Sequence, residues 1–108
     1  MNAENIKNEA YQLIDKYFMP AKAIIVKDFL NTYGFWDAPA STKYHGNHTG
    51  GLAEHSLAVA KNLLMLTEKL GLKWDNPGSP FIVGLLHDVC KMDQYKLIGT
   101  ENGYQYVY

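Results

Sequence analysis

The 108-residue sequence has one cysteine, a formal net charge of only −1 and no apolar run that approaches the about 20 residues needed to span a bilayer. The lone Cys90 excludes an internal disulfide framework and fits a reducing compartment. The near-neutral charge argues against a broad electrostatic surface for duplex nucleic acid but is compatible with a small nucleotide or phosphate site. The first five residues carry neither the basic nor the apolar segment of a secretory signal. We therefore expect a soluble, cytoplasmic protein with no membrane partner.

The composition is that of an ordinary globular domain. Hydrophobic residues make up 47% of the chain and charged residues 19%, which argues against disorder. The length allows a single core, and there are no internal repeats or low-complexity segments. We expect one domain over residues 1–108.

Two scaffold helices are predicted at the start of the chain. Residues Glu4–Phe18 have apolar positions at helical spacing, and Pro20 follows the end of that pattern. A second helix is predicted from about Ala21 to Tyr33, with Gly34 as its C-cap. Its apolar side is expected to hold Ile24, Ile25, Phe29 and Leu30.

Residues Phe35–Gly51 form a long connector without a sustained period, interrupted by proline and glycine. Lys43, His45 and His48 lie in this segment, just before the next helix. A loop of this length in a small domain is either functional or mobile. We take the three side chains as candidate substrate-binding groups, the alternative being surface polar residues of a plain connector.

Residues Gly51–Leu70 are the clearest amphipathic helix, closed by Gly71. His55 lies on the core-facing side of this helix, on a stripe formed by Leu52, His55, Val59, Leu63, Leu66 and Leu70. A turn at Trp74–Gly78 follows, and Ser79 is the expected N-cap of the next helix.

The stretch Phe81–Lys91 is predicted to be a helix that is apolar nearly all round, which is typical of a buried helix. Its second half nevertheless contains an adjacent imidazole and carboxylate, His87 and Asp88, with Lys91 one turn further on. A buried carboxylate without a partner costs several kcal/mol, so Asp88 should be paired, protonated or bound to a metal.

The C-terminal segment is rich in β-forming residues. Tyr95–Ile98 and Tyr104–Tyr108 flank Gly99–Gly103, whose Asn-Gly pair is a hairpin signal. The sequence therefore predicts a mainly α fold of about four helices with a C-terminal β-hairpin. The aromatic end of that hairpin, with Tyr104, Tyr106 and Tyr108, is a candidate contact for a homo-oligomer.

His55 and the His87-Asp88 pair are 32 positions apart, enough for two antiparallel helices and a turn. If the two helices pack, two imidazoles and one carboxylate converge. Such ligands suit Zn, Mn, Fe, Ni or Co, whereas Mg prefers more oxygen. We expect a divalent metal site on His55, His87 and Asp88. The structural alternative is a hydrogen-bonded His55 and an Asp88 paired to Lys91.

The motif Gly-Gly-Leu-Ala-Glu-His-Ser-Leu-Ala-Val-Ala, which ends at Ala60, is followed by Gly-Leu-Leu-His-Asp-Val-Cys-Lys, which ends at Lys91. Together they resemble the HD superfamily of metal-dependent phosphohydrolases. The segment from Pro39 to Gly51 looks most like the HD domain of certain bacterial exoribonucleases and of phage-type HD proteins. The resemblance covers about residues 35 to 98 and implies an HD-like helical bundle.

Carried over residue by residue, the resemblance matches His55 to the family's first histidine, and His87 and Asp88 to its doublet. The family's later aspartate has no counterpart, because Asp93 and Glu101 lie too near the doublet. Cys90 stands where glycine is common but is small enough to be tolerated. Since more helices follow in the family, we expect this chain to be the front part of such a domain. A further segment, a partner chain or water would then complete the metal site.

The resemblance implies a metal-dependent phosphohydrolase that acts on a nucleotide or a nucleic-acid-end phosphoester, including an RNA end. Its metal would be Mn, Fe, Ni, Co, Zn or Mg. Asp88 and Lys91 would be the catalytic residues, with Lys43, His45 and His48 on the substrate side. The alternative, motivated by the missing fourth ligand, is a non-catalytic HD-like module that binds a nucleotide or another ligand, or serves assembly.

Overall fold

The computed structural model describes residues 2–39, 48–93, 96–100 and 103–107, and it is mainly helical, as predicted. Its elements are the helices α1 (Ala3–Tyr17), α2 (Pro20–Thr32), α3 (Gly51–Leu70) and α4 (Ser79–Leu86), the short 3-10 helix η1 (Val89–Asp93), and the strands β1 (Lys96–Thr100) and β2 (Gly103–Val107). No helix among these described residues has both the length and the apolar character needed to cross a membrane.

Capping residues at the ends of the first three helices explain where these helices begin or end. Asn2 caps α1, because its side-chain oxygen accepts a hydrogen bond of 2.8 Å from the backbone N–H of Asn5. Gly34 has a φ of 77° after α2, which lets the N–H of Phe35 reach back 3.0 Å to the carbonyl of Leu30. The bounds of α3 are those predicted, with Gly71 at a φ of 62° as its C-cap.

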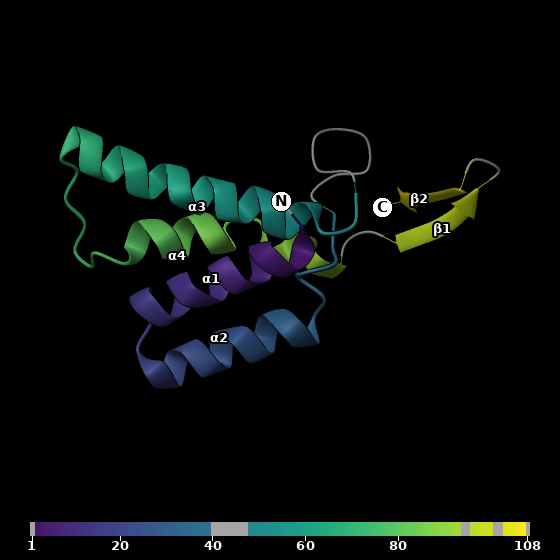
Figure 1. The fold of residues 1–108 in the computed structure, drawn as a ribbon, viewed down its shortest axis with the longest axis horizontal. Coiled ribbons are helices and arrows are strands. Elements are labelled where there is room, and N and C mark those ends of the chain that lie inside the picture. The colour runs from purple at the N-terminus through teal and green to yellow at the C-terminus, as the bar shows by residue number, and fades with distance from the viewer. Residues whose placement is uncertain (1, 40–47, 94–95, 101–102, 108) are drawn as a thin grey trace.

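The core lies between α1, α3 and α4, with Phe35 and Phe81 among its fully buried side chains. Figure 1 shows α4 lying along α3, with α1 next to them and α2 on the outer side of α1. The apolar side expected for α2 is therefore wrong for three of its four residues. Leu30 is buried, but Ile24, Ile25 and Phe29 are exposed, because α2 contacts the body through one narrow face.

The backbones of α3 and α4 lie very close together at Gly84. A Cβ atom at this position would lie 2.5 Å from the Cα atom of Ala60 and 2.8 Å from its backbone nitrogen. Only a glycine opposite a small residue permits this distance between two helix backbones. The contact fixes how near the end of α4 comes to the first half of α3, where His55 lies.

The prediction of one continuous helix over Phe81–Lys91 is wrong. α4 ends at Leu86, His87 and Asp88 form a turn, and η1 begins at Val89. The carbonyl of Gly84, which would accept from the N–H of residue 88 in a continued helix, is instead contacted by the His87 side chain. The N–H of Lys91 then bonds to the carbonyl of Asp88 at 3.0 Å in the tighter 3-10 pattern.

Three other details of α3 and α4 differ from the prediction. Ser79 is the first residue of α4 rather than its N-cap, because Asn76 organises the preceding turn through its side-chain and backbone oxygens. The end of the apolar stripe on α3 is exposed at Leu66 and Leu70, since α3 extends past the start of the shorter α4 (Figure 1). The helix α4 is not buried all round either, as Val83 is 52% exposed.

The two strands pair antiparallel, with Lys96 opposite Val107 and Thr100 opposite Gly103. Figure 1 shows them to one side of the helical body. The Asn-Gly turn is described only at Gly103, and the side chains of Tyr104, Tyr106 and Tyr108 lie outside the described part of the chain. The homo-oligomer contact therefore stays a prediction.

Replacing Gly84 should destabilise the fold. We expect Gly84→Ala to lower the free energy of unfolding by about 1–3 kcal/mol, because the added methyl group must push α3 and α4 apart. Chemical denaturation measures this difference. Val83→Ala, at the exposed neighbouring position in the same helix, is the matched control and should change stability by no more than about 0.5 kcal/mol. A Gly84→Ala protein as stable as the parent would contradict the close contact.

Candidate metal centre

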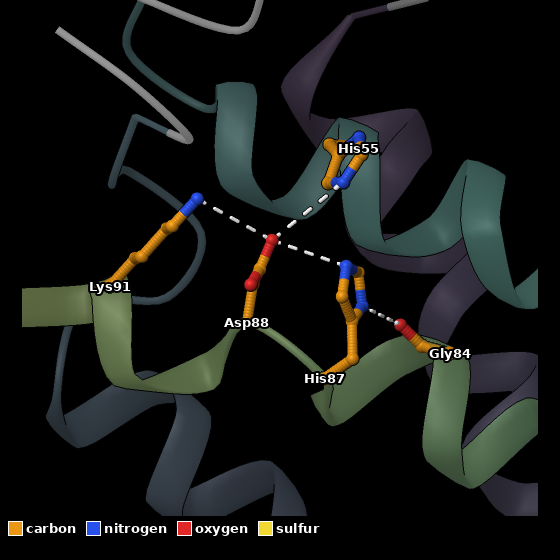
Figure 2. A network of polar contacts seen from close by, with 5 residues as sticks. All are labelled: His55, Gly84, His87, Asp88 and Lys91. Atoms are coloured by element: carbon orange, nitrogen blue, oxygen red, sulfur yellow. Dashed lines mark hydrogen bonds and ion pairs between the residues drawn. The ribbon is translucent and has the colours of Figure 1, made fainter.

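Three potential metal ligands converge from two parts of the fold. His55 projects from the first half of α3, whereas His87 and Asp88 come from the turn between α4 and η1 (Figure 2). One ligand atom of each residue lies within 4.8 Å of the others. The convergence predicted from the sequence is therefore present, although a turn rather than a helix supplies two of the three groups.

A single carboxylate oxygen is the centre of this cluster. Asp88 Oδ2 lies 3.1 Å from His87 Nε2 and 3.7 Å from His55 Nε2. Lys91, which belongs to η1, brings its Nζ atom to 3.5 Å from the same oxygen. Figure 2 shows the three nitrogens on different sides of Asp88. The side-chain nitrogens of His55, His87 and Lys91 thus all lie within 4 Å of Asp88 Oδ2.

The orientation of the His87 ring is fixed by a backbone group. Its Nδ1 atom lies 2.7 Å from the carbonyl oxygen of Gly84, and because a carbonyl only accepts, Nδ1 must carry the hydrogen and donate. Nε2 then faces Asp88 Oδ2 either as part of an imidazolium or with a bare lone pair. Two facing lone pairs repel, so a neutral ring needs either a proton or a metal ion between Nε2 and Oδ2. Metal-binding histidines commonly donate their second nitrogen to a carbonyl in this way.

The distances from Asp88 Oδ2 to the two imidazole nitrogens are close to those around a small divalent ion. With bond lengths of 2.0–2.2 Å, ligand atoms of a tetrahedral site lie about 3.3–3.6 Å apart. The two distances from Asp88 Oδ2, 3.1 and 3.7 Å, lie on either side of this value. The imidazole rings of His55 and His87 are 5.3 Å apart between centroids and inclined by 55°, so their nitrogens can point at a common position.

The cluster lies at the surface of the core rather than inside it. The side chains of His55, His87 and Asp88 are 36%, 31% and 26% exposed. The expected fully buried carboxylate is therefore wrong, because the turn after Leu86 brings Asp88 to the end of the helical pair. Partial exposure lowers the desolvation cost of the charges and leaves room for water or a substrate at the site.

The predicted substrate-side residues are only partly described. Lys43 and His45 lie outside the described residues. His48 is described, and its Nε2 lies 3.7 Å from Glu54 Oε2 rather than in the cluster. This pair lines a pocket of about 140 Å³ at the start of α3, together with Trp36 and the beginning of α1. Glu54 was not predicted from the sequence as the partner of His48.

In the part of the chain that the structure describes, the cluster of candidate ligands contains His55, His87 and Asp88 and no fourth group. The Gly84 carbonyl, which orients His87, was also missed from the sequence. The signal for it was the three-residue spacing between Gly84 and His87 at a helix end, where carbonyls lack helical partners.

No protein-family model matches the sequence, and comparisons with curated proteins and with solved structures gave no match either.

Metal binding should stabilise the fold through this cluster. An ion at 100 times its dissociation constant adds about 2.7 kcal/mol to the free energy of unfolding, or about 10–20 °C in Tm for a chain of this size. We expect Mn²⁺ or Zn²⁺ to produce such a shift in thermal unfolding and His55→Ala to abolish it. His48→Ala, which removes a histidine outside the cluster, should retain the shift. An equal shift in both variants would show that the ion binds elsewhere.

Proposed function

We propose that this chain is a metal-dependent phosphohydrolase of the HD type that acts on a nucleotide or a nucleic-acid-end phosphoester. The observation that carries the proposal is the convergence of His55 and His87 on Asp88, with Lys91 beside them. A helical body with two imidazoles and one carboxylate at the end of a helical pair is what the HD resemblance implies. The sequence motifs support the HD assignment, and the geometry supports the metal site that this assignment needs.

Each residue of the cluster has a role that follows from its chemistry. His55 and His87 would hold the ion as neutral ligands, with His87 kept in the correct tautomer by the Gly84 carbonyl. Asp88 would be the third ligand and would orient the attacking water with its carboxylate. The Lys91 ammonium, 3.5 Å from that carboxylate, would bind a phosphoryl oxygen of the substrate.

The proposed reaction is hydrolysis of a phosphoester. The oxygen of a water molecule forms a new bond to phosphorus, the bond from phosphorus to the ester oxygen breaks, and the leaving alcohol carries away a proton. The metal would supply Lewis-acid activation of the water and of a phosphoryl oxygen. The partial exposure of all three ligands supports this role, because an activated water and a substrate both need access to the ion.

The substrate class rests on the resemblance and on the neighbouring polar groups. Lys43, His45 and His48 precede α3 and would contact the substrate, which would be a nucleotide or the end of an RNA. The His48–Glu54 pair borders a pocket at the start of α3, so one of these groups already lies at a concave surface.

A second candidate function is favoured by the three-ligand cluster itself. With three ligands and a lysine that neutralises Asp88, the described site is also suited to bind a nucleotide without turning it over. In this function the chain is a non-catalytic HD-like binding or assembly module. Both functions involve a nucleotide; the hydrolase would convert it to products, whereas the binding module would leave it intact.

Hydrolysis should depend on the metal cluster. We expect the purified chain to bind a divalent ion and to hydrolyse members of a nucleotide and phosphodiester panel in its presence. His87→Ala should lower kcat/KM by at least about 100-fold, because loss of a ligand costs at least as much as loss of a group that orients one. Lys69→Met, an exposed charge change at the far end of α3, is the control.

The result that contradicts the hydrolase is equally specific. An absence of bound metal together with unchanged activity in His87→Ala would rule it out. A nucleotide that raises the melting temperature but is recovered intact would establish the binding module instead.

A further inference from the structure

We infer that a partly exposed aliphatic strip beside the metal cluster receives the apolar face of the substrate's base while the phosphoryl group lies at the cluster. The strip consists of four side chains on the ligand-bearing side of α3 and α4: Val59, Leu63, Leu66 and Val83. This inference rests on the proposed phosphohydrolase and names what the site would hold beyond the phosphate.

Helical spacing places the strip next to the two imidazoles. Val59 follows His55 by four residues in α3, and Val83 precedes His87 by four residues at the end of α4. Residues four apart lie on the same helix face, about 6 Å from one another. His87 keeps helical backbone angles, with φ at −61° and ψ at −30°, so this spacing holds up to the ligand. Each imidazole therefore has a valine one turn away along its own helix.

The two halves of the strip face the same side of the helical pair. The rings of the two histidines meet with 5.3 Å between their centroids, so the ligand-bearing sides of α3 and α4 adjoin (Figure 2). Val59 directly precedes Ala60, and Val83 directly precedes Gly84, where the two backbones are in close contact. In each helix one residue back is a rotation of about 100°, toward the side on which the histidine lies. The valines therefore flank the helix contact on the side of the ligands.

The strip is apolar surface that the helical body does not cover. Val83 is 52% exposed and Leu66 is 42% exposed. Val59 and Leu63 are half-buried, and within the described part of the chain neither belongs to the side chains that pack against the core. Apolar surface next to a few converging polar groups is typical of a ligand site.

The chemistry of the strip and of the cluster together selects the occupant. The cluster would bind an anionic phosphoryl group through its metal, whereas the four strip side chains carry no hydrogen-bonding group. A nucleotide fits both, because its phosphate and the flat face of its base are separated by a sugar. The polar groups of a base lie on its edges, so an aliphatic surface contacts its face alone. The strip would therefore accept purines and pyrimidines alike.

The size of the strip favours a small molecule over a protein. A stable protein interface buries roughly 800 Å² on each partner and about 20–30 residues a side. Four partly exposed aliphatic side chains present far less surface than that. One face of a base, in contrast, is covered by a few such side chains.

The first test compares benzylphosphonate with methylphosphonate, by isothermal titration calorimetry on the whole chain loaded with Zn²⁺. We expect benzylphosphonate to bind about three- to thirty-fold more tightly, because its ring is removed from water on the strip. Val83→Thr keeps the shape of the side chain but adds a hydroxyl, and should lower this ratio about two- to fivefold. Ile25→Thr places a hydroxyl at an exposed position on α2 and should leave the ratio unchanged.

The outcomes separate this inference from the function on which it rests. Equal affinity for the two phosphonates, with clear binding of both, would overturn the strip as a binding surface and leave the metal site intact. Binding of neither phosphonate to the loaded chain would overturn the proposed function and the inference together. A ratio that falls equally in Val83→Thr and Ile25→Thr would place the ring elsewhere and overturn the assignment of the strip.

The second test locates the ring by nuclear magnetic resonance of isotope-labelled valine methyl groups. Benzylphosphonate should move the signals of Val59 and Val83 through the ring current of its aromatic group, whereas methylphosphonate should not. Val26, which packs against the core from α2, is the internal control and should stay unchanged. Unchanged signals of both strip valines at saturating benzylphosphonate would contradict the inference.

A second copy of the chain is the competing occupant of the strip, and sedimentation velocity tests it. We expect the parent and Val83→Thr to have the same association state, because the strip faces the substrate. A dimer of the parent that Val83→Thr converts to a monomer would show that another protein chain covers the strip, and would overturn its assignment to the base.

Discussion

The contact between Gly84 and Ala60 is the constraint on which the rest of the arrangement depends. It brings the backbones of α3 and α4 so close that no side chain fits at position 84. His55 lies five residues before Ala60 and His87 three residues after Gly84, so this one contact sets the distance between the two imidazoles. The Gly84 carbonyl also fixes the His87 ring. Gly84 therefore serves both the packing of the two helices and the orientation of the His87 ring.

The electrostatics of the site follow from the end of α4. A helix continued through Asp88 would have kept the carboxylate against the apolar core, where an unpaired charge is costly. The turn at His87 and Asp88 moves it to the edge, within reach of two imidazoles and one ammonium. The turn therefore gathers one anion and three nitrogen groups that come from α3, from the turn itself and from η1.

Much of the fold and of the candidate site could be predicted from the sequence, because these features depend on residues that are close together in the chain. Glycines with positive φ ended α2 and α3 where predicted, and the spacing of His55 and His87 placed them on neighbouring segments. The end of α4 could not be predicted, since apolar residues resume at Val89 after His87 and Asp88, and nothing in the periodicity marks a competing side-chain bond to Gly84. The exposure of Ile25 could not be predicted either, because it depends on which face of α2 packs against α1.

The short connection between α3 and α4 affects how early the ligand cluster can form during folding. His55 lies on α3, His87 and Asp88 directly follow α4, and the two helices are joined by the short segment 71–78, so the chain closes only a small loop to bring the cluster together. The entropy of closing such a loop is low, and contacts between neighbours in sequence form early in folding. The imidazoles and the carboxylate can meet as soon as this helical hairpin closes, before α1 and α2 have docked.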